Sequence, residues 1–341
     1  MRVKILVTGA SGFVGSHVVT ELIRRQRQVI ATSRSPFSIA GAEARQVTDL
    51  CADTDWRHCL GDVNTVIHCA ARVHVMHETA QHPLKLFREV NVAGTIALAE
   101  QAAQSGVSQF IFMSSIKVNG EATSREIPFQ ETDAPKASDP YGISKAEAEV
   151  ALQAIGKRYG MAITIIRPPL VYGRGVGANF LSMLRWVKKQ IPLPLASINN
   201  LRSFVYVRNL ADLIAHCVQN PKAYGEVFFV SDGQDLSTPD LLKQAACALQ
   251  LPSRLFSFPP RLLILGASLL GKRSIADRLC QSLRVDTSKA RQLLDWQAPY
   301  SLQQGLGDCI ASLSVLSANA DASKNTHPSQ NPEQHHNETS I

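Results

Sequence analysis

The sequence predicts an α/β protein: a doubly wound parallel sheet followed by a smaller, mostly helical C-terminal lobe. In the first half of the chain, short β-rich apolar runs alternate with helical patterns. This alternation is typical of strand–helix–strand units. A glycine-rich turn separates the first apolar run from the first helical pattern. After Arg167 the alternation ends, and prolines and glycines mark irregular loops.

The strands expected in the first half are short and apolar. Residues 3–7 form a nearly continuous apolar run, which suits a central strand buried on both faces. The other expected strands are 29–31, 46–47, 65–68, 109–113 and 162–166, and the expected helices are 13–25, 83–104 and 141–159.

The second half predicts a substrate-binding lobe interleaved with the last strands of the sheet. Expected helices are 180–189, 239–248, 260–271 and 288–294. The apolar stretch 262–270 is too short to span a bilayer. We expect it to be a buried helix, with peripheral membrane contact as the alternative. The expected domains are 1–168 for the dinucleotide-binding unit, 169–315 for the substrate lobe and 316–341 for a polar tail, expected to be disordered.

Composition excludes several functional classes. The net charge is +7, but lysines and arginines are spread along the 341 residues, so no nucleic-acid partner is expected. The seven cysteines are odd in number and none has CxxC spacing, which indicates reduced thiols and a cytoplasmic protein. No signal peptide or integral membrane segment is predicted. No metal site is expected, the adjacent His335 and His336 of the tail included.

The glycine-rich turn TGASGFVG, residues 8–15, predicts a dinucleotide site. Gly9, Gly12 and Gly15 follow a strand and open a helix. Such glycines allow a tight turn, close approach of the backbone to a pyrophosphate and close packing of the helix on the sheet. The candidate cofactor contacts in this turn are Gly9, Ser11, Gly12, Phe13, Val14 and Gly15.

The end of the second strand bears on the choice between NAD and NADP. An NAD site usually has an acidic residue about 20 residues past the glycines, where it binds the ribose 2′-hydroxyl. Residues 29–35 read VIATSRS, with Arg34 and no acid. An arginine there suits a 2′-phosphate, so we expect NADP, with NAD as the alternative.

Tyr141 and Lys145 predict an acid–base pair. They lie four residues apart just inside a helix, so they share one face. A nearby ammonium favours a phenolate, and we therefore expect Lys145 to lower the pKa of Tyr141. Ser115, at the end of strand 109–113, is expected to hold the substrate oxygen beside Tyr141.

These motifs resemble the extended short-chain dehydrogenases/reductases, in particular the NAD(P)-dependent epimerase/dehydratase group. The resemblance covers residues 4 to about 312. It depends on TGASGFVG, DL at 49–50, HCAA at 68–71, NVAGT at 91–95, SS at 114–115, YGISK at 141–145 and RPPLVYG at 167–173. RSFVYV at 202–207 and DTSK at 286–289 extend it into the second lobe.

The resemblance implies a Rossmann domain and a set of site residues. Ser115, Tyr141 and Lys145 would be catalytic, with Lys145 also binding the nicotinamide ribose. Further cofactor contacts would be Asp49, Leu50, Ala70, Ala71, Asn91 and Pro168. Asn179 and Arg202 match positions that hold a nucleotide diphosphate, Arg278 is a looser match, and Lys117 is a further candidate substrate contact. A homodimer is the oligomeric state that we expect.

Two positions depart from the family pattern. Leu170 stands where many members have a substrate-binding asparagine, and Asn119 replaces a tyrosine that often precedes the glycine. Some contacts to the sugar must therefore differ. Ile116-Lys117 also replaces the Asp-Glu pair of sugar dehydratases, and family decarboxylases place a glutamate nearby, so both of these chemistries are disfavoured.

What remains is hydride transfer at a sugar carbon, with Tyr141 handling the proton; the resemblance implies that this carbon is C4 of a UDP-sugar. The whole pattern resembles a bacterial UDP-glucose 4-epimerase-like subgroup that includes reductases of 6-deoxy-amino sugars for surface polysaccharide. We expect a 4-ketoreductase of a UDP-4-keto-6-deoxy-N-acetylhexosamine in O-antigen (lipopolysaccharide) biosynthesis. The alternatives are a UDP-glucose or UDP-N-acetylglucosamine 4-epimerase, a reductase of non-sugar ketones, and an inactive NADP-binding scaffold.

Overall fold

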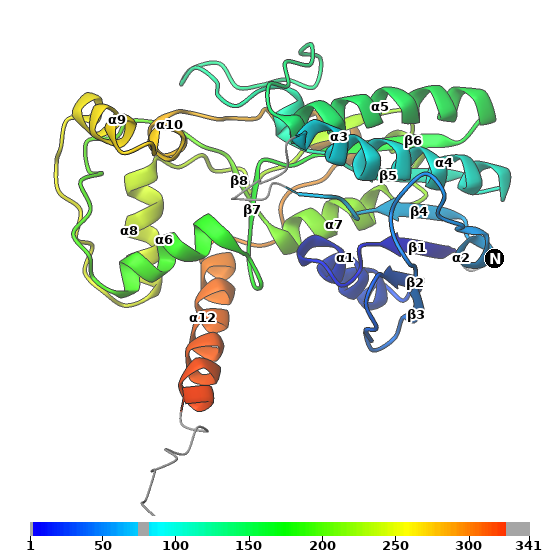
Figure 1. The fold of residues 1–341 in the computed structure, drawn as a ribbon, viewed down its shortest axis with the longest axis horizontal. Coiled ribbons are helices and arrows are strands. Elements are labelled where there is room, and N and C mark those ends of the chain that lie inside the picture. The colour runs from blue at the N-terminus through cyan, green and yellow to red at the C-terminus, as the bar shows by residue number, and fades with distance from the viewer. Residues whose placement is uncertain (1–2, 74–81, 325–341) are drawn as a thin grey trace, which may run out of the picture.

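A seven-stranded parallel sheet forms the centre of the N-terminal domain, as the sequence predicts (Figure 1). The computed structural model describes residues 3–73 and 82–324. The strand order is β3-β2-β1-β4-β5-β6-β9. The sheet strands are β1 (Lys4–Thr8), β2 (Gln28–Ser33), β3 (Glu43–Gln46), β4 (Thr65–His68), β5 (Gln109–Met113), β6 (Ala162–Arg167) and β9 (Val227–Phe229). The order reverses between β1 and β4, the switch point at which doubly wound sheets bind ligands.

Helices cover both faces of this sheet. Those of the N-terminal domain are α1 (Phe13–Arg24), α2 (Arg57–Leu60), α3 (Pro83–Arg88), α4 (Gly94–Gln104), α5 (Pro140–Tyr159), α7 (Val207–Cys217) and α11 (Ser288–Leu294). Alternate side chains of each strand point to opposite faces. Ile5 and Val7 pack with α1 and α7, whereas Leu6 packs with α4 and α5. Burial of both faces accounts for the continuous apolar runs in the sequence.

The expected helix 83–104 is interrupted. A π-helical turn, Glu89–Ala93, separates α3 from α4 and carries the buried Asn91. Such turns are often found at functional sites.

The second lobe contains a two-stranded parallel sheet and a group of helices. Its elements are β7 (Leu170–Tyr172), β8 (Phe204–Tyr206), α6 (Ala178–Lys188), α8 (Thr238–Ala248), α9 (Pro260–Leu269), α10 (Arg273–Cys280) and α12 (Leu302–Lys324). Tyr172, Phe180 and Tyr206 form the centre of one apolar cluster in this lobe. Strand β9 lies between these elements in the chain but belongs to the large sheet, which confirms the expected interleaving.

Two expectations for the second lobe are wrong. Helix α9 was expected to be buried, yet none of its residues is buried. One face packs against α8 and α10, and the other faces solvent. Helix α12 runs to Lys324, into the segment expected to be a disordered tail from residue 316. Residues 325–341, with His335 and His336, lie outside the described residues.

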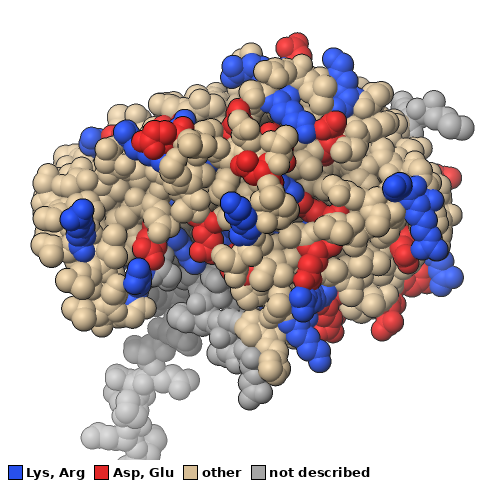
Figure 2. Space-filling model, turned by 90° about the horizontal axis from the view of Figure 1, so that it is seen from above, with Lys and Arg blue, Asp and Glu red and all other residues tan. Residues whose placement is uncertain are grey.

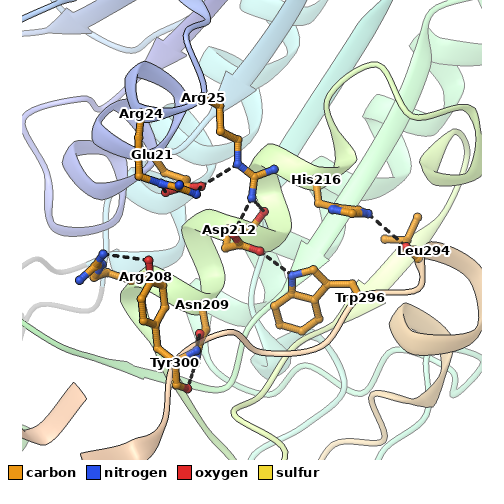
Figure 3. Close-up of polar contacts among 10 residues, drawn as sticks. All are labelled: Glu21, Arg24, Arg25, Arg208, Asn209, Asp212, His216, Leu294, Trp296 and Tyr300. Carbon is orange, nitrogen blue, oxygen red and sulfur yellow. Dashed lines mark hydrogen bonds and ion pairs between the residues drawn. The ribbon is translucent and has the colours of Figure 1, made fainter. Parts of the chain in front are cut away.

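Polar contacts join α1, α7 and the segment before α12 (Figure 3). Arg25 forms ion pairs with Glu21, at 2.6 Å, and with Asp212 of α7, at 2.5 Å. Asp212 also accepts a hydrogen bond of 2.8 Å from the indole nitrogen of Trp296. Asp212 therefore connects α1 and α7 to the C-terminal segment that contains Trp296.

No helix in the described ranges is long and apolar enough to cross a membrane. All seven cysteines are free thiols.

Replacing Asp212 by alanine should lower the free energy of unfolding by about 2–3 kcal/mol, because Arg25 and Trp296 lose a charged acceptor in a mostly buried setting. Urea denaturation followed by circular dichroism measures the change. The matched control is Arg57→Ala, which removes an ion pair to Asp55 in which both side chains are exposed. Its unfolding midpoint should match that of the unchanged chain. Equal destabilisation by the two substitutions would contradict the prediction.

Candidate active site

The predicted site residues lie along the carboxyl edge of the parallel sheet. Thr8 of β1 pairs in register with His68 of β4, and Met113 of β5 pairs with Ile166 of β6. Because these strands end together, the loops that follow them meet at the same edge. The glycine turn, Ala70, Ser115 and Pro168 all belong to these loops.

The glycine turn has the geometry of a dinucleotide cradle. Gly9 adopts a φ of +65°, and its carbonyl accepts a hydrogen bond of 2.9 Å from the Gly12 amide. A Cβ on Gly9 would lie 2.7 Å from the Ala70 amide nitrogen, and one on Gly15 would lie 2.2 Å from the Gly9 carbonyl oxygen. No side chain caps the start of α1 at Gly12. The first amides of α1 are thus available to a phosphate, and the cradle fits a dinucleotide.

The other residues of the turn are exposed or half-buried. Ser11 is exposed, and its hydroxyl lies 2.7 Å from that of Ser33 at the end of β2. Phe13 and Val14 are half-buried and pack on the second-lobe cluster that contains Tyr172. The first turn of α1 is therefore in contact with both domains.

The residues expected around the adenosine lie beyond β2 and β3. Arg34 is exposed directly after β2, and its backbone carbonyl accepts a hydrogen bond of 2.9 Å from Gln46. Asp49 is exposed and accepts a hydrogen bond of 2.7 Å from the amide of the buried Leu50. Both charged side chains are accessible to a ligand.

Asn91 contacts protein groups. It is fully buried and exchanges hydrogen bonds with both backbone groups of Arg72, at 2.8 and 3.0 Å. It also donates to the hydroxyl of Ser144, at 3.0 Å. Both functional groups of its amide are used in these bonds, so Asn91 positions the loop that carries Ala70 and Ala71 against α5. Its expected contact with the cofactor stays a prediction beside this structural role.

A neutral histidine supports the same loop. His68 is completely buried, and burial lowers its pKa to about 3. Its ring nitrogens lie 2.7 Å from the Thr8 hydroxyl and 3.0 Å from that of Thr95. Because the Thr95 hydroxyl donates to the Asn91 carbonyl, Thr95 accepts from Nε2, and Nδ1 accepts from Thr8. This chain of bonds fixes the ends of β1 and β4 relative to each other.

The structure brings Ser115, Tyr141 and Lys145 together. Ser115 follows β5, and its hydroxyl lies next to that of Tyr141. Lys145 is buried, and its ammonium donates to the Met113 carbonyl at 2.8 Å. The Ile116 amide donates to the Pro168 carbonyl at 3.0 Å, which places Pro168 beside the Ser115 turn.

The expected effect of Lys145 on Tyr141 is not seen. Burial raises the pKa of Tyr141 to about 12, the carboxylate of Asp139 adds to the rise, and the hydrogen bond with Ser115 opposes it. The Lys145 ammonium points to the Met113 carbonyl and lies 4.4 Å from the centre of the Phe112 ring. Burial lowers the pKa of Lys145 to about 8.

Lys117, a candidate substrate contact, is engaged with the protein. Its ammonium lies 3.1 Å from Asp139 and 3.8 Å from Glu121. Asp139 is the N-cap of α5 and accepts hydrogen bonds from the amides of Tyr141 and Gly142. A Cβ on Gly142 would lie 2.8 Å from the Lys117 carbonyl oxygen. Lys117 therefore joins the turn after Ser115 to the start of α5, where Tyr141 lies.

A buried ion pair behind the site was not predicted. Glu149 of α5 and Arg167 of β6 lie 2.5 Å apart, and their side chains are only 5% and 6% exposed. Ser114 donates to Glu149, and Arg167 donates to the Asn119 side chain at 3.0 Å. Ser114 therefore helps to position α5, and Asn119 supports Arg167. The sequence signal is Arg167, a charged residue at the end of a strand whose other residues are uncharged and mostly apolar.

The second lobe contributes two neighbouring arginines. Arg202 donates hydrogen bonds of 3.0 Å to the carbonyls of Arg278 and Gln281. Burial and the charge of Arg278 lower the pKa of Arg202 to about 10. Arg278 is exposed, as is Leu170 to 37%. The side chain of Asn179 lies outside the described part of the structure.

The dinucleotide cradle and the grouped Ser115, Tyr141 and Lys145 define an extended short-chain dehydrogenase/reductase. Residues 5–230 match the model of the NAD dependent epimerase/dehydratase family. The chain belongs to this family, as the motifs predict.

Relatives with known names support this assignment. The chain is 45% identical over 307 residues to a UDP-glucose 4-epimerase of Vibrio cholerae, covering 89% of this chain and 94% of the relative. It is 27% identical over 338 residues to a 3-beta-hydroxysteroid dehydrogenase of Mycolicibacterium neoaurum, covering 90% of each. The solved structure of MoeE5 in complex with UDP-glucuronic acid and NAD has a TM-score of 0.74 and 26% identity, covering 92% of this chain and 99% of that one.

Replacing Gly9 by alanine should weaken NADH binding more than tenfold, since the added Cβ would push the turn away from Ala70 and open the cradle. Titration of protein fluorescence with NADH measures the affinity. Gly225→Ala is the control, because Gly225 also has a positive φ, +77°, but open space around it. It should cost about 1 kcal/mol of stability and keep the affinity. Unchanged NADH affinity in Gly9→Ala would contradict the prediction.

Proposed function

We propose that this enzyme transfers hydride at C4 of a UDP-linked sugar. The observation that carries the proposal is that Ser115, Tyr141 and Lys145 gather at the sheet edge that also carries the dinucleotide cradle, with Ser115 next to the Tyr141 hydroxyl and the Lys145 ammonium on the Met113 carbonyl. Ser115 would hold the sugar oxygen, and Tyr141 would move its proton. Lys145 would bind the ribose of the cofactor. A bound nicotinamide cofactor supplies or accepts the hydride.

The two arginines of the second lobe support a nucleotide diphosphate as the recognised group. Arg202 donates to the backbone carbonyls of Arg278 and Gln281, and the Arg278 side chain is exposed. The charge of Arg278 lowers the pKa of Arg202, and two neighbouring guanidinium groups favour a dianionic ligand between them. A diphosphate provides that charge.

The relative from Vibrio cholerae favours 4-epimerisation as the overall reaction. In that reaction the sugar is oxidised at C4, turned over within the site and reduced from the other face. Tyr141 would take the proton in the first half and return it in the second. The family and the solved complex point to NAD as the cofactor for this cycle.

A single reduction, as in a UDP-4-keto-sugar 4-ketoreductase, is the second candidate. It is favoured by Tyr141, whose pKa of about 12 keeps the phenol protonated and ready to donate at neutral pH. It is also favoured by Arg34, which is exposed where a 2′-phosphate of NADP would lie. The homodimer and the cytoplasmic location stay predictions.

An assay with two substrates tests the proposal. We expect the purified chain either to interconvert UDP-hexoses without net change in nicotinamide absorbance, or to consume NADPH when given UDP-4-keto-6-deoxy-N-acetylglucosamine. Tyr141→Phe should lower the rate by about 10²–10⁴ in whichever reaction occurs. If the purified chain converts no UDP-hexose and consumes no NADPH, the proposal is overturned. A near-unchanged rate in Tyr141→Phe would remove the tyrosine from the mechanism.

The reaction rate should fall above about pH 8, because Lys145 loses its proton there and with it the charge that would hold the ribose. The Tyr141 phenol keeps its proton until about pH 12, so its ionisation does not cause the fall in rate above about pH 8. Measuring kcat from about pH 6 to about pH 10 checks the prediction, with circular dichroism at each pH to confirm folding. If Lys145→Arg is active, its kcat should not fall above about pH 8, because arginine keeps its charge there. A flat profile in the unchanged enzyme would contradict the assignment.

A further inference from the structure

Helices α9 and α10 form the far end of the second lobe and carry an exposed apolar surface (Figure 1). We define this surface, the α9–α10 surface, by its five large side chains: Leu262 (52% exposed), Leu265 (58%), Leu269 (81%), Leu270 (74%) and Ile275 (48%). Exposed apolar surface of this kind marks an interaction site more often than chance.

The arrangement within α9 shows that two faces of the helix have different surroundings. Residues 263, 264, 267 and 268 are half-buried, whereas 261–262, 265–266 and 269–270 are exposed. Leu263 packs on the apolar cluster that contains Leu242 and Ala246 of α8. Leu262, Leu265 and Leu269 follow the spacing i, i+3, i+7 and so form one stripe. Packing of the core requires only the half-buried face of α9. The leucines on its exposed face are therefore not explained by folding.

Charge around the surface points to an anionic partner. Residues 251–278 include Arg254, Arg261, Lys272, Arg273 and Arg278, with Asp277 as the single acid. Asp277 lies 3.7 Å from Arg273 and offsets part of one charge. In the space-filling view, the end of the molecule with α9 and α10 is mainly uncharged with separate basic side chains (Figure 2). A second copy meeting the same surface would bring like charges together.

We propose that the α9–α10 surface docks on a lipid bilayer that contains anionic lipids. The leucine stripe would enter the boundary between headgroups and acyl chains, and Arg261, Lys272 and Arg273 would contact lipid phosphates. The contact is peripheral, since no described helix can cross a membrane. Because α10 carries Arg278, docking places the candidate diphosphate site close to the bilayer surface.

Co-sedimentation with vesicles tests the proposal. The full chain should pellet with vesicles of equal parts phosphatidylglycerol and phosphatidylethanolamine, and much less with phosphatidylcholine alone. The double variant Leu265→Asp, Leu269→Asp should reduce binding at least about tenfold. Arg261→Gln with Lys272→Gln should remove the difference between the two vesicle types. Ile127→Asp is the matched control, because Ile127 is 73% exposed on another surface, and it should bind as the unchanged chain does.

Several outcomes would overturn the proposal. These are an unchanged chain that stays in the supernatant, a leucine variant that binds normally, and equal loss of binding in Ile127→Asp. A dimer, seen by sedimentation velocity without vesicles and abolished in the leucine variant, would instead assign the surface to a second copy. Thermal unfolding of each variant confirms that it is folded, which is expected because the substituted side chains lie outside the core.

Discussion

The buried ion pair between Glu149 and Arg167 holds the candidate active site together. Two charges removed from water are stable only when each has its partners, and loss of either partner leaves an uncompensated charge in the core. Here the pair joins α5, which carries Tyr141 and Lys145, to β6. Through Ser114 it also reaches the end of β5. The three residues with expected chemical roles thus come from elements tied to one another by the same network.

The fold could be predicted from the sequence because two local signals agreed. The apolar runs of the strands and the spacing of the glycine turn both require a doubly wound sheet with a ligand at the switch point. The grouping of Ser115 with Tyr141 followed for the same reason, since parallel strands end at one edge. The direction of the Tyr141 pKa could not be predicted, because it depends on burial and on where the Lys145 ammonium points.

The partners of individual side chains could not be predicted from the sequence, because three-dimensional packing determines them. Asn91, an expected cofactor contact, forms hydrogen bonds with Arg72 and Ser144. Lys117, an expected substrate contact, forms an ion pair with Asp139, the N-cap of α5. The hydrophobicity of residues 262–270 predicts a buried helix, but several of its leucines are exposed to solvent.

Gly142 shows how a residue without a side chain can determine the position of its neighbour, Tyr141. Helix α5 begins against the turn after Ser115 so closely that a methyl group at position 142 would lie 2.8 Å from the Lys117 carbonyl oxygen. Any larger residue would act as a spacer between the helix and the turn. It would carry the Tyr141 hydroxyl away from Ser115 while leaving every functional group of the site in the chain. The absence of a Cβ at position 142 therefore sets how closely the start of α5, with Tyr141, can approach the turn after Ser115.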